Sequence, residues 1–110
     1  MQRFVKTLRL KPDPELIKGY IEAHDAIWPV IRDGLRQAGI GSMEIYLLGS
    51  LAVMIVEMPD GLDHDEAFSR LSALPGQQEW EEFVSRFQEC GEGDSSAQKW
   101  QPMSKIFSLG

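Results

Sequence analysis

Hydrophobic and polar residues alternate along three stretches of this chain, and the alternation predicts β-strands. The first stretch covers residues 4–10 and ends before a Pro-Asp-Pro sequence. Two further runs, residues 43–48 and 51–58, are rich in strand-forming residues. Only Gly49 and Ser50 separate these two runs. Such a dipeptide closes a tight turn, so we expect the two strands to pair antiparallel.

A helical pattern follows the first strand over residues 14–38. Its core-facing stripe advances in steps of four, four, three and four residues through Leu16, Tyr20, His24, Ile27 and Ile31. His24 therefore occupies a position that normally carries an apolar side chain. Pro29 lies inside the same pattern, where it removes a backbone hydrogen bond and crowds the preceding turn. We expect a kink or break there, close to His24.

The second half of the chain predicts two more helical segments, over residues 63–74 and 77–89, separated by Pro75 and Gly76. The apolar face of the later segment carries Trp80, Phe83, Val84 and Phe87. Residues 103–109 form a short apolar run that is expected to add a last strand.

The resulting order of elements is β, α, β, β, α, β within a single domain covering residues 1–110. This order is typical of the ferredoxin-like α+β fold, in which helices cover one face of an antiparallel sheet. The other face of such a sheet stays bare. We therefore expect a homodimer in which two subunits pack sheet to sheet, as in dimeric α/β-barrel assemblies, or exchange edge strands.

Composition narrows the range of partners. The net charge of −6 disfavours binding to nucleic acid or to anionic membranes, which needs clustered Lys and Arg. No apolar run approaches the roughly 20 residues that span a bilayer, and the charged N-terminal residues do not resemble an export signal. Cys90 is a lone cysteine, which fits a reducing compartment. These features predict a cytoplasmic protein with a small-molecule ligand.

Tyr20 and His24 are the first candidates for chemistry, because residues four apart on a helix can touch. An imidazole beside a phenol can accept and donate protons near neutral pH. The alternative is a core histidine whose ring is satisfied by a backbone carbonyl. The pattern alone leaves both interpretations open.

Tyr46 and Trp80 also have two interpretations. Tyr46 could bind a polar ligand if its strand face meets the pocket, or it could be a cross-strand aromatic with its hydroxyl in water. Trp80 could be an ordinary core residue, or it could offer a flat face to a sugar ring. The pattern does not choose between them.

No metal or cofactor is expected. His64 is far in sequence from His24, and no His or Cys pair has the spacing of a metal site. The acidic residues near 63–66 and 79–82 resemble solvated helix surface rather than a paired catalytic site. Proton transfer by protein side chains is the remaining chemistry.

The chain resembles the L-rhamnose mutarotase family over nearly its whole length. The resemblance rests on the segment Tyr20-Ile-Glu-Ala-His24-Asp-Ala-Ile-Trp28-Pro29, on Leu35, Gly39 and Ile45-Tyr46-Leu47, and on Glu57, the Trp80 helix and Ile106-Phe107. It implies a ferredoxin-like homodimer that interconverts the α and β anomers of a 6-deoxy sugar without metal or cofactor.

The resemblance also implies roles for individual residues. It assigns the catalytic histidine to His24 and substrate contacts to Tyr20, Tyr46 and Trp80. The family's second helix tryptophan is replaced here by Glu81. Similarity in the segments 41–46, 75–83 and 99–101 favours the L-fucose branch of the family over the L-rhamnose branch.

The sequence-based hypothesis makes His24 the principal acid and base, with Tyr20 or Tyr46 orienting the sugar and Trp28 and Trp80 forming an apolar wall. Two alternatives stay open, because this fold hosts many functions. One is a haem-binding or small-molecule oxygenase type of protein, with His24 as an axial ligand. The other is a non-catalytic sugar-binding module.

Overall fold

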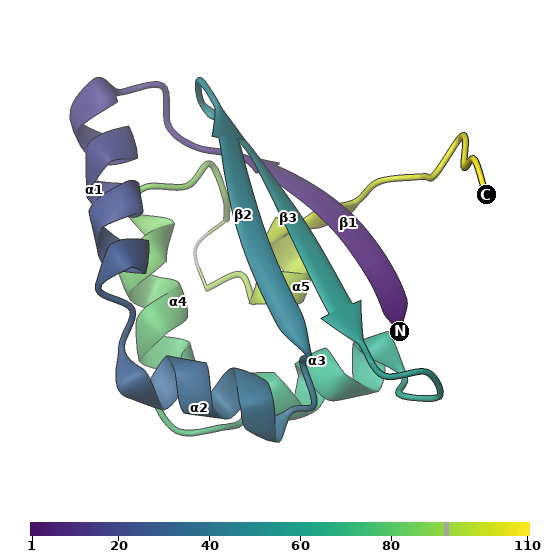
Figure 1. Cartoon of the computed structure of the whole chain (residues 1–110). Helices are drawn as coiled ribbons and strands as arrows, with labels where there is room; N and C mark the ends of the chain where they lie inside the picture. Colours follow the sequence, from purple (N-terminus) through teal and green to yellow (C-terminus); the bar gives the residue numbers. More distant parts are fainter. Residues whose placement is uncertain (92) are drawn as a thin grey trace.

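One antiparallel sheet organises the chain (Figure 1). The computed structural model describes residues 1–91 and 93–110. Among these residues, four strands pair in the order β2-β3-β1-β4: β1 (Gln2–Arg9), β2 (Ser42–Leu48), β3 (Leu51–Met58) and β4 (Gln101–Pro102). Helices follow β1 and β3, so the predicted ferredoxin-like α+β fold is confirmed.

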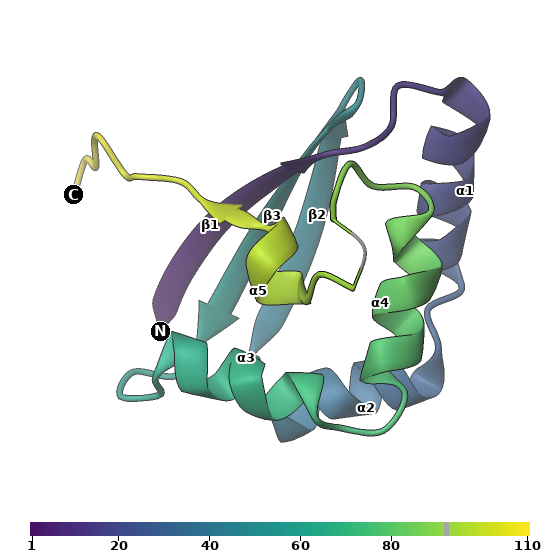
Figure 2. The same ribbon diagram turned by 180° about the vertical axis from the view of Figure 1, so that it is seen from behind.

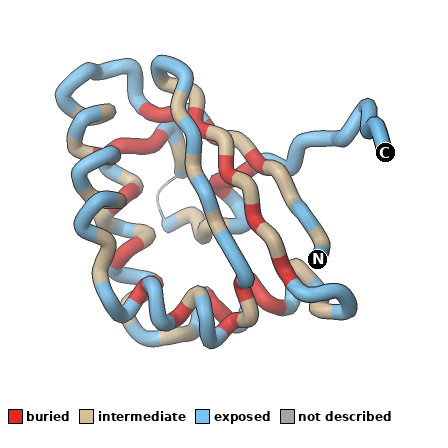
Figure 3. The backbone as a smooth tube through the Cα atoms, in the orientation of Figure 1, coloured by how far each residue is buried: buried red, intermediate tan, exposed pale blue. Residues whose placement is uncertain are grey.

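The helices lie on one side of this sheet (Figures 1 and 2). They are α1 (Pro14–Asp25), α2 (Pro29–Gln37), α3 (His64–Ser72), α4 (Gln77–Ser85) and α5 (Ser96–Lys99). Alternate residues of β3, including Ala52, Met54 and Val56, are buried beneath them (Figure 3). The core and any interior site therefore lie between the sheet and the helices.

The irregularity predicted around Pro29 is a complete break between two helices. α1 ends at Asp25, Trp28 has extended backbone angles, and Pro29 is the first residue of α2. The first helical position needs no backbone N–H donor, so proline is tolerated there, and the residue before a proline avoids helical angles. Because Pro29 starts a second helix, the chain avoids the missing hydrogen bond and the steric clash that a proline causes inside one long helix.

A second turn separates α3 from α4. Gly76 caps α4 with a positive φ of 83°, a conformation that L side chains rarely adopt. A β-carbon at this position would also lie 2.7 Å from a methyl group of Val30. The turn therefore requires glycine and holds α4 close to the start of α2.

The predicted last strand over residues 103–109 is wrong. The strand is β4, which pairs Gln101 and Pro102 with β1, and the residues after it form no regular structure. Pro102 has no backbone N–H to donate a hydrogen bond to a neighbouring strand. Ile106 and Phe107 are adjacent, so a strand would direct them to opposite faces, and both lie in solvent, 95% and 76% exposed.

None of the helices in the described part of the chain is long and apolar enough to cross a membrane.

Candidate active site

His24 lies in the last turn of α1 with its ring half-buried. Its Nδ1 is 2.9 Å from the carbonyl oxygen of Tyr20. A carbonyl only accepts, so Nδ1 carries the proton, and Nε2 of the neutral ring holds the lone pair. The backbone contact expected of a core histidine is thus present, but it engages only one ring nitrogen. Among the described residues, Nε2 has no hydrogen-bond partner, which leaves it able to accept a proton.

An aromatic cluster surrounds this histidine. The His24 ring lies 4.5 Å from the Tyr20 ring and 5.4 Å from Trp80, measured between centroids. Trp28 packs edge-on against Trp80 at 5.1 Å and stacks on Phe83 at 5.5 Å. The structure therefore brings together four residues singled out in the sequence: Tyr20, His24, Trp28 and Trp80.

Tyr20 is almost completely buried, with 2% of its surface exposed. Burial raises the pKa of its hydroxyl to about 12; the charge of Glu81 acts in the same direction, and a hydrogen bond from Gln88 opposes it. The Gln88 Nε2 donor is 3.5 Å from the tyrosine oxygen. The phenol consequently stays protonated at physiological pH, so its hydroxyl keeps a proton that it can donate.

A small cavity of about 60 Å³ lies between this cluster and the sheet, lined by Tyr20, His24 and Trp80 among others. It adjoins a groove of about 680 Å³ beside α3 and α4. Five residues line both spaces: Phe68, Leu71, Gln77, Glu81 and Ser96. A ligand of monosaccharide size needs more room than the cavity alone, so side chains at this junction would have to move apart to admit it.

The cavity wall also contains buried polar groups that the sequence analysis did not single out. Within the described residues, Gln77 Nε2 and Gln88 Oε1 are buried without a hydrogen-bond partner. Buried polar atoms are normally satisfied, so a ligand with several hydroxyl groups suits them. Gln77 lies on α4, three residues before Trp80, whereas Gln88 follows the end of that helix and forms a β-bridge with Leu10. For Gln77, the helical spacing from Trp80 was the available signal.

Glu81 and Lys99 form a partly buried ion pair at the junction. The side chain of Lys99 is inaccessible to solvent, and its ammonium donates to Glu81 Oε2 at 2.7 Å and to the Glu81 carbonyl oxygen at 2.9 Å. A partly buried charge pair of this kind is retained at a cost in desolvation. Because Glu81 also lines the cavity, the pair places a carboxylate beside the aromatic cluster.

Tyr46 is separated from the other predicted site residues. It is 54% exposed on the outer face of β2, where its hydroxyl lies 3.4 Å from Glu44. The cavity is lined instead by its inward-facing neighbours Met43 and Ile45. Within a single chain, therefore, the Tyr46 hydroxyl does not face His24, and a substrate contact by Tyr46 stays a prediction.

The arrangement is suited to acid–base chemistry on a small polyhydroxylated molecule. It combines a free imidazole nitrogen, a protonated phenol, aromatic surfaces and buried amides around one space. Across residues 1–91 and 93–110, no group of three or more His, Cys, Asp and Glu side chains is placed to hold a metal ion.

Two structural comparisons agree on the fold. The chain aligns over its full length with the crystal structure of an L-rhamnose mutarotase from Formosa agariphila, with a TM-score of 0.72 and 15% identity. It also aligns over its full length with tetracenomycin F2 cyclase from Streptomyces glaucescens, with a TM-score of 0.60 and 16% identity. At these identities the likeness concerns the fold alone.

Sequence comparisons identify the family. An L-fucose mutarotase from Xanthomonas campestris is 33% identical over 111 residues, covering 99% of this chain and 89% of that protein. The family model for L-rhamnose mutarotase matches residues 3–109. The chain therefore belongs to the L-rhamnose mutarotase family.

Proposed function

We propose that this protein interconverts the α and β anomers of a 6-deoxy-L-hexose, with L-fucose as the preferred sugar. The observation that carries the proposal is the pairing of His24 and Tyr20 on the wall of one cavity. Family membership supports isomerisation over the haem-binding, oxygenase and non-catalytic alternatives. A cytoplasmic location remains a prediction.

Anomer exchange needs a proton removed from one oxygen and a proton delivered to another. In the proposed reaction His24 Nε2 takes the proton of the anomeric hydroxyl while the ring oxygen is protonated, and the bond between C1 and the ring oxygen breaks. Tyr20 is the donor that the geometry offers for the ring oxygen. Rotation of the open-chain aldehyde and the reverse transfers then close the ring on the other face.

The hydrogen bond from Nδ1 to the Tyr20 carbonyl has a specific part in this scheme. It fixes the ring orientation and keeps the proton on Nδ1, so that Nε2 is the basic nitrogen. Trp80 packs edge-on against the imidazole, Trp28 packs against Trp80, and the two indoles offer an apolar surface for the C–H face of a sugar.

The choice of sugar rests on Glu81. L-Fucose and L-rhamnose differ in the orientation of the hydroxyl groups at C2 and C4. A carboxylate held by Lys99 accepts hydrogen bonds from hydroxyls in a defined direction, which an aromatic side chain cannot do. The similarity to an L-fucose mutarotase from Xanthomonas campestris supports the same preference.

A homodimer is also part of the proposal. The outer face of the sheet carries Val5, Val53, Ile55 and Tyr46, and the helices of the described chain lie on the opposite side (Figure 1). Two copies packed through this face would cover those side chains. Val53→Glu is expected to convert a dimer into a monomer in sedimentation equilibrium, because it would bury two charges in the interface. A wild-type monomer at all concentrations would contradict the dimer.

His24→Ala is expected to lower the rate of anomer exchange by about 10² to 10⁴-fold, since general acid–base catalysis contributes that much. Magnetisation-transfer NMR on equilibrated L-fucose measures the exchange directly. Glu22→Ala, at an exposed position of the same helix, serves as the matched control and should keep the wild-type rate. Circular dichroism and thermal melting establish that both variants fold. A folded His24→Ala protein that exchanges anomers at the wild-type rate would contradict the proposal.

Tyr20→Phe is expected to lower kcat/KM for anomer exchange by about 10² to 10⁴-fold, because it removes the proposed proton donor to the ring oxygen while keeping the buried ring. With a pKa of about 12, the wild-type phenol stays protonated between pH 6 and 10. The ratio of wild-type to variant rates should therefore be constant over this range. A ratio that falls towards one as pH rises to 10 would mean that the phenol already loses its proton there.

The double variant Glu81→Gln/Lys99→Met removes both charges of the ion pair together and avoids leaving one of them unpaired. We expect it to reduce the ratio of kcat/KM for L-fucose over L-rhamnose by about tenfold, the value of one charge-assisted hydrogen bond. Exchange rates with each sugar measure this ratio. An unchanged ratio in a folded variant would assign the sugar preference to other residues.

A further inference from the structure

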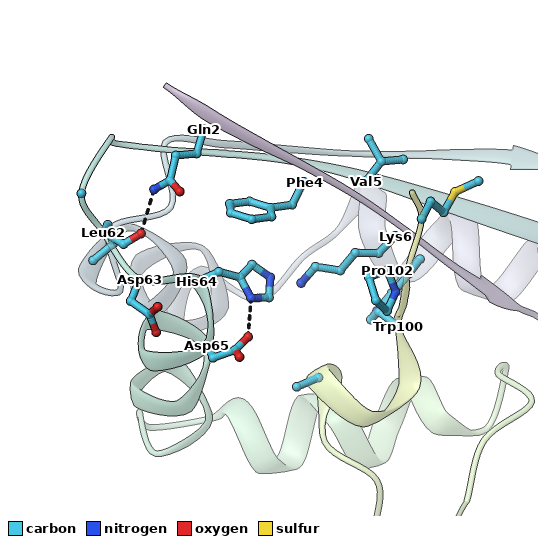
Figure 4. A pocket seen from close by; sticks show the side chains of 13 residues that line it. Gln2, Phe4, Val5, Lys6, Leu62, Asp63, His64, Asp65, Trp100 and Pro102 are labelled. Carbon is cyan, nitrogen blue, oxygen red and sulfur yellow. Dashed lines mark hydrogen bonds and ion pairs between the residues drawn. The ribbon is translucent and has the colours of Figure 1, made fainter. Parts of the chain in front are cut away.

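A second and larger cavity lies apart from the His24 site, between the start of β1 and the start of α3 (Figure 4). Its volume is about 770 Å³, and its wall includes Phe4, Lys6, His64, Asp65 and Trp100. We call it the Lys6 cavity. Of the residues that the structure describes, Trp100 alone lines both this space and the small cavity beside His24. The reaction proposed at His24 therefore assigns no role to the Lys6 cavity.

Lys6 is an unusual residue for the inner face of a sheet. It is 4% exposed, and its ammonium lies 3.7 Å from the centroid of the Phe68 ring. Within the described residues, this ammonium has no hydrogen-bond acceptor and no ion-pair partner. Burial lowers the pKa of Lys6 to about 8, and the charge of Asp65 opposes that shift. A buried ammonium held only by a ring is costly, so a counter-charge in the cavity would stabilise it.

His64 faces Lys6 across the cavity. Its Nδ1 lies 2.9 Å from Asp65 Oδ1, and its ring packs against Phe4 at 4.6 Å and Phe68 at 4.7 Å. These contacts fix the ring, and in Figure 4 the Lys6 and His64 side chains point towards each other. Among the described residues, the buried Nε2 of His64 has no hydrogen-bond partner. Among the described residues, Lys6 Nζ and His64 Nε2 therefore face the same cavity, and neither has a hydrogen-bond partner.

We propose that Lys6 and His64 form a binding site for a small organic anion with a carboxylate or phosphate group. Lys6 supplies a point charge, and protonated His64 donates from Nε2 while Asp65 stabilises the imidazolium. Phe4 and Trp100 offer apolar surface to the rest of the ligand.

Two acidic side chains, Asp63 and Asp65, also line the Lys6 cavity, and each already has a partner. Asp63 accepts from the backbone N–H of Glu66 as the cap of α3, and the carboxylate of Asp65, almost fully exposed, is paired with His64. Because the Asp65 carboxylate faces solvent and pairs with Nδ1 of His64, Nε2 of His64 and the Lys6 ammonium are left for an anion in the cavity.

The test is a calorimetric titration with inorganic phosphate and, separately, with acetate, at pH 6.5 and constant ionic strength. We expect saturable binding of at least one anion with a Kd below about 10 mM. Lys6→Met and His64→Gln should each weaken it at least tenfold, and Lys18→Met, at an exposed position of α1, should leave it unchanged. The phosphate and acetate arms distinguish the two ligand groups.

Lys6→Met is suited to this test because it replaces a buried charge by an apolar side chain of similar length, so it should fold at least as stably as the wild type. Thermal melting without added anion checks this, and His64→Gln provides an independent variant. Absence of saturable binding would overturn the proposal. So would binding that Lys6→Met and His64→Gln leave intact, or that Lys18→Met weakens equally.

Discussion

Pro29 has no backbone N–H, and its ring cannot fit behind a preceding helical turn, so the helix that starts at Pro14 ends before it. The arrangement of the candidate site depends on this constraint. The break leaves His24 in the last turn of α1, where its ring lies against Trp80. It also places Trp28 in an extended segment, from which the indole contacts both Trp80 and Phe83. In an uninterrupted helix, Trp28 would instead continue along the axis of α1 and would not have this extended backbone.

The polar groups of this protein's interior are concentrated at cavities rather than spread through the core. Gln77, Gln88 and the Glu81–Lys99 pair line or adjoin the space beside His24, while Lys6 and His64 converge on the other cavity. Fully buried positions away from the cavities, such as Val56 and Met58, are apolar. Each buried polar group costs stability unless it is paired, so their placement is easier to understand as ligand recognition than as packing.

The two cavities share structural support. Phe68 lines the space beside His24 with one part of its surface and carries the Lys6 ammonium on its ring. Trp100 lines both spaces and immediately precedes β4, the short strand that pairs with β1 at Lys6 and Thr7. The segment from Lys99 to Pro102 therefore holds the ion pair, the shared wall and the sheet edge together. A shift of this segment would move Trp100 and so change the shape of both cavities.

Features that follow from local rules could be predicted from the amino-acid sequence. Helical spacing predicted that Tyr20 and His24 share a face, proline chemistry predicted the interruption at Pro29, and the order of elements predicted the fold. Three features became visible only in the folded chain: Tyr46 faces away from His24, Lys99 contacts Glu81, and the Lys6 and His64 side chains point towards each other. Alternation along a strand separates two faces without saying which one is covered, and contacts between distant residues depend on how the layers pack.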